Sequence, residues 1–276
     1  MLASESELIL YALWMNEPPP EISVIISTYN DRALLEKKLN EILRQTFFDR
    51  AEFIFVEPAS PGGERILLEP FCSKHANCRL LALDERVRLY SAWNLGWEAA
   101  QGEFVCISNM DDSMHPDLLR QVTDEMRSNQ WDLASVLITK QLLGTDWPEL
   151  EGRRTRALTL STRPGPFFAW RRELKDTLGM FEDRMLIAGD KDFWARAADA
   201  RLRIGLVPGI LYIYSKHPGQ LSKDRESEKA KAADLKIANE KSYPHVWPES
   251  IQREVRYQRM LQYFIGWQRV NCASAY

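Results

Sequence analysis

The feature that most constrains this chain is a series of short, continuous apolar segments, each followed by a stretch with helical periodicity. Apolar segments of four to seven residues without polar alternation are typical of strands buried on both faces. Regular alternation of strand and helix predicts an α/β fold of the Rossmann-like kind, with a mostly parallel sheet and helices on both faces. The predicted strands lie at 21–27, 53–56, 80–83, 104–107 and 134–139.

The segments between and after these strands are expected to be helical or looped. Asn30 and Asp31 are expected to cap the first helix of the sheet, where Leu35 and Ile42 fall on one face. A loop at 140–166 lacks periodicity, and a loop of this length in a compact domain is usually functional. Other predicted elements are helices near 93–100, 116–129, 171–178 and 190–200, and two short strands at 204–207 and 210–214.

Composition narrows the class of protein. The 276 residues carry a formal net charge of -3, so there is no cationic field to hold nucleic acid. No apolar run approaches the roughly 18–20 residues of a transmembrane helix, and no signal peptide is evident, so a cytoplasmic location, with peripheral membrane association allowed, is expected. Cys72 and Cys78 flank His75, but buried free thiols are favoured over a metal site because no second pair lies nearby.

Ligands of parallel sheets bind beyond the carboxyl ends of the strands, and polar residues follow several strands here. Thr28-Tyr29-Asn30, Glu57 and Asn109-Met110-Asp111-Asp112 occupy such positions. Two adjacent carboxylates repel each other unless a cation or hydrogen-bond donors lie between them. Their hard oxygen ligands favour Mg²⁺ or Mn²⁺. The alternative is a helix cap, with Asp112 or Ser113 preceding the helix at Pro116.

Two further candidates lie in the second half of the chain. Asp190 and Asp192 flank Lys191 at the start of a predicted helix. A carboxylate in this position is either a general base for a hydroxyl or a cap that compensates the helix dipole. His217 precedes Pro218-Gly219 after a strand, where it is either a metal ligand or an ordinary loop histidine.

Several weaker candidates each have a functional and a structural interpretation. Glu57 either accepts a hydrogen bond from a nucleotide base or faces solvent, and Arg86 either neutralises phosphate or is surface charge. Tyr29 either stacks on a flat ring or packs in the core. Trp170, in the predicted loop 167–170, either supports a sugar ring or belongs to the core.

The order of these motifs resembles that of family 2 glycosyltransferases of the GT-A fold, over 21–222. The first strand through Asn30 resembles the opening strand of the family, and Glu57-Pro58-Ala59-Ser60 resembles its acidic loop. Asn109-Met110-Asp111-Asp112 stands in the place of the D-x-D motif. The remaining matches are Ala92-Trp93-Asn94 with Ala100-Gln101-Gly102-Glu103, Gly189-Asp190-Lys191-Asp192-Phe193-Trp194, and 214–222, whose histidine is His217.

The resemblance implies an inverting, metal-assisted hexosyltransferase that uses a nucleotide-sugar donor, with UDP as the expected nucleotide. The acceptor is a hydroxyl of unknown identity, on a glycan, a lipid-linked sugar or a small molecule. Asp111 and His217 would hold Mn²⁺ or Mg²⁺, and Asp190 would be the general base. The donor would contact Thr28, Tyr29, Glu57, Arg86, Asn109 and Asp111.

The resemblance also divides the chain into a helical segment at 1–20, a catalytic domain at 21–222 and a helical extension at 223–276. Three positions depart from the family pattern: Pro58, Asn109 at the first acidic position of the D-x-D motif, and Gly189 in place of a glutamate. The alternative is therefore a catalytically inactive GT-A domain that binds a sugar or a partner. A nucleotidyltransferase is disfavoured because the first strand lacks a following Gly-rich basic loop, and a processive synthase because the Gln-x-x-Arg-Trp motif is absent.

Overall fold

The fold was analysed in a computed structural model of the chain. The structure describes residues 18–156, 166–218, 229–230, 232–234, 237 and 267–269. Residues 1–17 of the expected helical segment at 1–20, and most of the expected extension at 223–276, therefore lie outside the described residues. The predicted catalytic domain at 21–222 is described except for 157–165 and 219–222.

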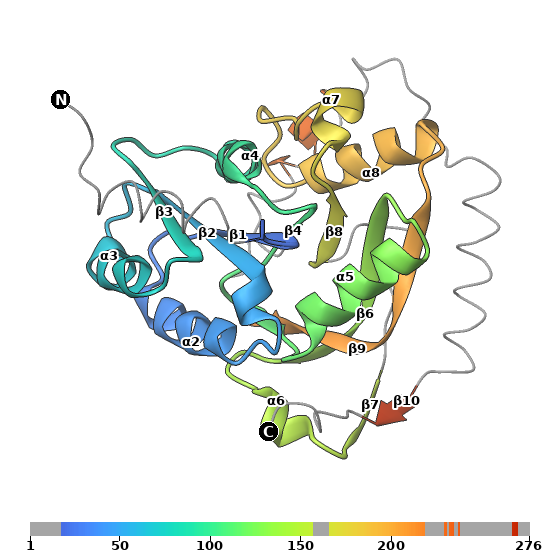
Figure 1. The fold of residues 1–276 in the computed structure, drawn as a ribbon. Helices are drawn as coiled ribbons and strands as arrows, with labels where there is room; N and C mark the ends of the chain where they lie inside the picture. The colour runs from blue at the N-terminus through green and yellow to red at the C-terminus, as the bar shows by residue number, and fades with distance from the viewer. Residues whose placement is uncertain are drawn as a thin grey trace, which may run out of the picture.

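An eight-stranded sheet forms the centre of the molecule, in the order β3-β2-β1-β4-β8-β6-β9-β5 (Figure 1). Four neighbouring pairs are parallel: β1 with β2, β2 with β3, β1 with β4, and β6 with β9. Within this sheet of the described residues, β8 and β5 run antiparallel to their neighbours. The predicted mostly parallel sheet is thus confirmed. Its strands are β1 (Ile22–Ser27), β2 (Ala51–Pro58), β3 (Cys78–Leu83), β4 (Phe104–Ile107), β5 (Ser113–Met114), β6 (Leu133–Leu142), β8 (Phe168–Arg171) and β9 (Ile204–Lys216).

Helices cover both faces of this sheet, and side chains of β1 alternate between two cores. Val24 and Ile26 pack in one core with α2 (Arg32–Leu43), α3 (Arg65–Lys74) and α5 (Leu118–Ser128). Ile25 packs in the other core with α4 (Leu89–Ala99), α7 (Leu174–Leu178) and α8 (Gly189–Asp199). Figure 1 shows α4, α7 and α8 on the opposite side of the sheet from α2 and α3. A strand with apolar side chains on both faces is what its continuous apolar sequence predicts.

The predicted loop at 167–170 is wrong, because residues 168–170 belong to β8, which lies between β4 and β6. Trp170 pairs with Val105 of β4 and with Leu133 of β6, and it is fully buried. Its ring packs edge-on against Trp97 of α4. Trp170 is therefore a core residue, and the sugar-platform interpretation is wrong. The four consecutive apolar residues 167–170 have the pattern of a buried strand, which the neighbouring prolines and glycine obscured.

Two other predicted boundaries are also corrected. The strands at 204–207 and 210–214 are one strand, β9, whose pairing with β6 shifts register at Pro208-Gly209. Gly209 has φ of +92°, which glycine adopts without steric cost. The supposed loop at 140–166 contains the end of β6, then α6 (Trp147–Leu150) and β7 (Arg154–Arg156), which pairs with β10 (Trp267–Arg269).

The start of α2 also differs from the predicted cap. Asp31 occupies the position before the helix, but its side chain makes no capping hydrogen bond to the described residues. The backbone N–H of Asp31 instead donates to Glu64 Oε1 at 2.6 Å, and that of Asn30 donates to Ser60 Oγ at 2.7 Å. Asn30 has φ of 54°, in the left-handed region that Asn tolerates better than most residues. The loop after β2 therefore holds the turn after β1.

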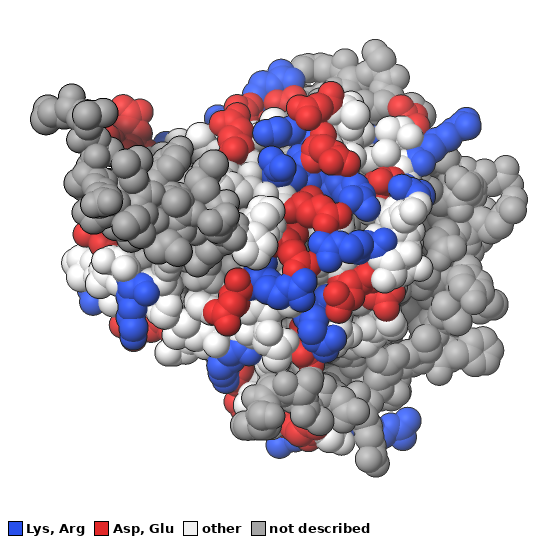
Figure 2. All heavy atoms as spheres, in the orientation of Figure 1, with Lys and Arg blue, Asp and Glu red and all other residues white. Residues whose placement is uncertain are grey.

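The described cysteines are free thiols, and the charged side chains are mixed in sign over the surface shown in Figure 2. Cys72, Cys78 and Cys106 are free thiols, and burial raises the pKa of Cys72 to about 11 and of Cys78 to about 12. Acidic and basic side chains are interspersed over the face shown in Figure 2. In the described part of the chain, no helix is long and apolar enough to cross a bilayer.

Candidate active site

The candidate residues meet at one edge of the sheet. Because β1, β2, β4, β6 and β9 all run in the same direction, their carboxyl ends lie together. Thr28 follows β1, and Glu57 is the second-last residue of β2. Asn109 and Asp111 follow β4, and His217 follows β9. The topology thus places residues from distant parts of the sequence at the edge where ligands bind parallel sheets.

Asp111 and His217, the two predicted metal ligands, are direct neighbours. His217 Nε2 lies 2.9 Å from Asp111 Oδ2, and both side chains are partly accessible to solvent. One carboxylate oxygen and one imidazole nitrogen form a donor set that suits Mn²⁺ or Mg²⁺ with open coordination positions. Within the described ranges, no group of three His, Cys, Asp or Glu side chains could enclose an ion. Asp111 and His217 would thus supply two protein ligands to a cation bound at this position.

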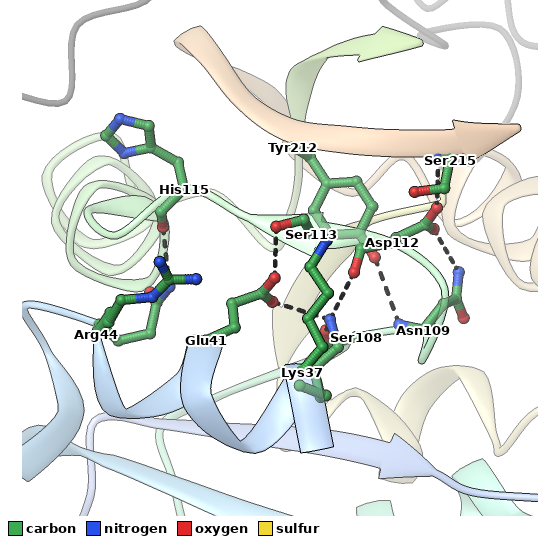
Figure 3. Close-up of polar contacts among 12 residues, drawn as sticks. Lys37, Glu41, Arg44, Ser108, Asn109, Asp112, Ser113, His115, Tyr212 and Ser215 are labelled. Atoms are coloured by element: carbon green, nitrogen blue, oxygen red, sulfur yellow. Dashed lines mark hydrogen bonds and ion pairs between the residues drawn. The ribbon is translucent and has the colours of Figure 1, made fainter. Parts of the chain in front are cut away.

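Asp112 faces the protein interior and has a structural position. It is 4% exposed, and its carboxylate accepts hydrogen bonds from the backbone N–H of Ser215 at 2.9 Å and from Asn109 Nδ2 at 3.1 Å. Figure 3 shows Asp112 between these two residues. Burial, reinforced by the charge of Asp111, raises the pKa of Asp112 to about 7. The helix-cap alternative is wrong, because the residue preceding α5 is Asp117 and Asp112 instead ties the loop after β4 to β9.

Thr28, Tyr29 and Arg86 line the edge next to β1. Thr28 is 1% exposed, and its hydroxyl has no hydrogen-bond partner among the described residues. Tyr29 is 39% exposed, so its core interpretation is wrong. The guanidinium of Arg86 lies over the ring of Tyr29, 4.3 Å from the centroid, which is cation–π geometry. The structure thus brings an orphan hydroxyl and a stacked aromatic–arginine pair to this edge.

Glu57 is buried rather than facing solvent, with 1% of its surface exposed. Its carboxylate accepts hydrogen bonds from the backbone N–H of Ser60 and from Arg65 Nε, and Arg65 also donates to the carbonyl oxygen of Leu83. These contacts join the ends of β2 and β3 to the start of α3. The geometry makes Glu57 a support of the loop beside Thr28.

Asp190 lies on the first turn of α8 and is half-buried. Its Oδ1 accepts hydrogen bonds from the hydroxyl of Tyr90 at 3.3 Å and from the N–H of Lys191 at 2.9 Å. Burial raises the pKa of Asp190 to about 6, and the contacts with Lys191 and Tyr90 oppose this rise. A carboxyl group with a pKa near 6 is ionised at neutral pH and more basic than an ordinary aspartate, as a general base requires.

Gly189 and Asp192 have clear structural roles beside Asp190. A Cβ at Gly189 would lie 2.8 Å from the ring of Tyr90, so the small residue leaves room for Tyr90 to reach Asp190. Asp192 is 5% exposed and forms an ion pair with Arg196, one turn further along α8, at 3.0 Å. The two aspartates therefore differ: Asp192 is committed to Arg196 inside the fold, whereas Asp190 remains partly accessible.

Asp234 is a site residue that sequence reasoning missed. It is 2% exposed, and its carboxylate accepts hydrogen bonds from three consecutive backbone N–H groups, those of Leu186, Ile187 and Ala188, at 2.8–2.9 Å. These residues lead directly into α8 and Asp190. Since Asp234 lies in a charged, helical stretch of sequence, its pattern is that of a surface residue.

Comparison of the sequence with known proteins identifies relatives of one kind. The sequence profile described as "Glycosyl transferase family 2" matches residues 23–183, more than half of the chain. An uncharacterized glycosyltransferase, EpsJ of Bacillus subtilis, is 26% identical over 74% of this chain and 63% of its own length. Glycosyltransferase AglE of Haloferax volcanii is 25% identical over 76% of this chain and 72% of its own length. This chain thus spans less than two thirds of EpsJ.

Solved structures share the fold. TarS 1-349 of S. aureus, solved in complex with UDP-GlcNAc, has a TM-score of 0.63 and 21% identity, over 79% of this chain and 67% of its own. The mannosyltransferase PcManGT of Pyrobaculum calidifontis, solved with GDP-Man and Mn²⁺, has a TM-score of 0.62 and 21% identity, over 86% of this chain and 73% of its own. The sheet, the motif order and the match over 23–183 lead to one assignment: the chain belongs to glycosyl transferase family 2.

Proposed function

We propose that this protein transfers a sugar from a nucleotide-sugar donor to a hydroxyl acceptor with inversion at the sugar carbon. The observation that carries the proposal is the contact between Asp111 and His217, 2.9 Å apart at the carboxyl edge of the sheet. Membership of glycosyl transferase family 2 supports the same reaction class. A hydroxyl acceptor remains the proposed second substrate.

The donor nucleotide is proposed to lie beside Thr28, Tyr29 and Arg86. The buried hydroxyl of Thr28 has no partner within the described ranges, so a donor group could satisfy it. Tyr29 offers an exposed ring for stacking, and Arg86 brings positive charge toward a diphosphate. We propose that Glu57 acts by holding the adjacent loop, because its carboxylate is already bound by Ser60 and Arg65.

Uridine is the proposed base, and guanosine is the alternative to test. The TarS structure contains UDP-GlcNAc, whereas the PcManGT structure contains GDP-Man. Because Glu57 is buried, its carboxylate does not by itself select uracil. Asn109 is proposed to line the donor side of the loop after β4, although its amide nitrogen already donates to Asp112 and to the carbonyl oxygen of Pro166.

Asp111 and His217 are proposed to hold Mn²⁺ or Mg²⁺. When bound, such a cation neutralises charge that develops on the leaving nucleoside diphosphate. Asp112 does not compete for this role, since its carboxylate is bound to Asn109 and Ser215 inside the fold. The same contacts hold the loop on which Asp111 is carried.

Asp190 is proposed as the general base. Its carboxylate takes the proton of the acceptor hydroxyl while the acceptor oxygen forms a bond to the sugar carbon. The bond from that carbon to the donor phosphate oxygen breaks on the opposite face, so the configuration inverts. The hydroxyl of Tyr90 donates a hydrogen bond to Asp190 Oδ1 and so orients the carboxylate. The raised pKa of Asp190 makes this carboxylate a stronger base.

A catalytically inactive binding domain has less support. Its case rests on Asn109 and Gly189, which depart from the family pattern. However, Gly189 makes room for the Tyr90–Asp190 contact, and Asn109 supports Asp112. Both departures therefore have a structural explanation that leaves Asp111, His217 and Asp190 in place.

The test is an assay of nucleoside diphosphate release from a panel of UDP- and GDP-sugars, with Mn²⁺ or with chelator. A mixture of simple glycosides serves as acceptor, and Asp190→Asn serves as the inactive control. Release that requires the cation and falls in the control is the expected result. If no donor is consumed and none raises the melting temperature, the proposed activity is wrong.

A further inference from the structure

A fully buried lysine lies behind the loop that carries Asp111. Lys38 is on α2 and is 1% exposed. Its ammonium donates three hydrogen bonds: to Glu41 Oε1 at 2.9 Å, to Ser108 Oγ at 3.1 Å and to the carbonyl oxygen of Asp112 at 2.8 Å. An ammonium group has three protons, so every one of them is used.

Two of the three acceptors of Lys38 lie at the two ends of the loop that carries Asp111. Ser108 directly follows β4, and Asp112 ends the stretch 109–112. The other oxygen of Glu41 accepts a hydrogen bond from Ser113, the first residue of β5. Figure 3 shows Glu41, Ser108, Asp112 and Ser113 gathered between α2 and β9. The pair of Lys38 and Glu41 thus holds the residues immediately before and after Asn109-Met110-Asp111.

A second set of contacts holds the same loop from β9. The carboxylate of Asp112 accepts the N–H of Ser215, two residues before His217, and the N–H of Asn109 donates to the hydroxyl of Tyr212 at 3.4 Å. Asp111, between the clamped residues, then reaches His217 at 2.9 Å. The loop is therefore fixed from α2 on one side and from β9 on the other.

The charge of Lys38 is costly to bury, which argues that it has a specific role. Burying an ion pair is often no better for stability than apolar packing of similar volume. Neighbouring positions on the same face of α2, such as Leu35 and Ile42, are apolar. Here the ammonium faces the carboxylate of Glu41 and the backbone of a loop that also carries Asp111 and Asp112.

We propose that Lys38 is a positioning residue, an internal cation that holds the loop 108–112 so that Asp111 faces His217 before any ion binds. The inference rests on the proposed function, because it assigns Lys38 to the support of the proposed cation site. It predicts that the loop is ordered in the free protein and that the order depends on the ammonium group. Lys38 itself touches neither donor nor cation.

The test compares Lys38→Met with Lys37→Met. Both variants remove one ammonium from adjacent positions of α2, but Lys37 donates instead to the carbonyl oxygen of Thr145, at 3.3 Å. The first measurement is hydrogen exchange in the metal-free protein, for peptides covering 105–116 and 208–218. Lys38→Met is expected to speed exchange of both peptides at least tenfold, and Lys37→Met to leave them within twofold of wild type.

The second measurement is Mn²⁺ affinity in the presence of excess UDP and, separately, of excess GDP, monitored by the electron paramagnetic resonance signal of the free ion. We expect Lys38→Met to weaken Mn²⁺ binding about tenfold or more, with Lys37→Met unchanged. If wild type binds no Mn²⁺, the proposed cation site fails, while the exchange measurement still decides the role of Lys38. Unchanged exchange of both peptides in a folded Lys38→Met protein overturns the inference.

The double variant Lys38→Met with Glu41→Gln separates positioning from stability. Lys38→Met alone leaves the carboxylate of Glu41 buried without its cation, which can unfold the protein. The double variant removes both charges, so its melting temperature should lie nearer to wild type. The exchange rate of 105–116 should nevertheless stay raised. If the double variant recovers both wild-type stability and wild-type exchange of 105–116, Lys38 only neutralises the charge of Glu41. That result would overturn the inference.

Discussion

His217 Nε2 lies 2.9 Å from Asp111 Oδ2, although the two residues are 106 positions apart in the sequence. The contact joins the loop after β4 to the end of β9, two segments that the strand order brings to the same edge. Neither residue is committed to a buried partner in the way that Asp112 is committed to Ser215. We therefore propose this pair as a place where an incoming ion binds.

Loss of His217 should weaken the cation site less than loss of Asp111. His217→Ala removes a neutral ligand, whereas Asp111→Ala removes a charged one. We expect intermediate Mn²⁺ affinity for His217→Ala in calorimetric titrations with UDP present. Identical Mn²⁺ affinities for wild type and His217→Ala would remove His217 from the site.

Substitution of Asp190 should lower turnover, whereas substitution of Asp192 should lower stability. A general base typically contributes ~10²–10⁴-fold to rate, so Asp190→Asn should lower turnover by about that factor while donor affinity stays near wild type. Asp192→Asn is the matched control, and it should mainly lower the melting temperature because Asp192 is buried against Arg196. Turnover and donor Kd are measured for both. An active Asp190→Asn beside a folded but inactive Asp192→Asn would move the base to Asp192.

The activity should depend on the ionisation of Asp190. Its pKa of about 6 predicts that turnover rises with pH through about 6, as the carboxylate forms. The hydrogen bond from Tyr90 lowers this pKa, so Tyr90→Phe should move the midpoint of the rise to higher pH. The pH profile of turnover checks both points. If the midpoint of the Tyr90→Phe profile shifts to lower pH, or does not shift, the hydrogen bond from Tyr90 does not lower the pKa of Asp190.

The same raised pKa has a consequence for stability. The folded protein holds the proton of Asp190 more tightly than an unfolded chain, whose aspartate has a pKa near 3.8. The stabilising contribution is therefore present at low pH and is lost as the pH rises from about 4 to 6. Asp190→Asn, which cannot ionise, should melt at a higher temperature than wild type at pH 7.5 and lose this advantage near pH 4. Scanning calorimetry at both pH values provides the comparison.

Asp234 should be required for the loop that precedes Asp190. Asp234→Ala leaves the N–H groups of Leu186, Ile187 and Ala188 without their acceptor. Hydrogen bonds to a charged group contribute about 1.5–3 kcal/mol each. We therefore expect the free energy of unfolding to fall by at most several kcal/mol in Asp234→Ala. Turnover should fall with donor Kd unchanged, and Asp234→Asn should retain part of both. Wild-type turnover in Asp234→Ala would show that the contact does not position Asp190.

The sheet could be predicted because its strands have a distinctive composition. The continuous apolar residues of β1, β2 and β4 have few alternatives to burial on both faces. β8 was missed because its apolar run directly follows the turn-forming residues Pro164-Gly165-Pro166. Periodicity alone cannot distinguish such a run from an apolar loop when turn residues stand beside it.

The sequence indicated some residues of the candidate site and not others. Asp111, His217 and Asp190 stand at strand or helix ends, where the local pattern leaves two interpretations open and the family resemblance selects the functional one. Lys38 and Asp234 are buried charged residues in stretches that look like solvated helix. Their roles depend on partners 46 to 74 positions away. Such roles follow from tertiary contacts, which the local sequence does not encode in a recognisable pattern.

The proposed role of Asp111 in cation-dependent donor binding can be measured by calorimetry. UDP, and separately GDP, is titrated into wild type and into Asp111→Ala, with and without Mn²⁺. Asp111 is partly exposed and touches His217, so its removal should leave the fold intact, as circular dichroism can verify. We expect wild type to bind at least one of the two nucleotides only when Mn²⁺ is present, and folded Asp111→Ala to bind neither. Equal Mn²⁺-dependent binding by the two proteins, or no binding of either nucleotide by wild type, would contradict it.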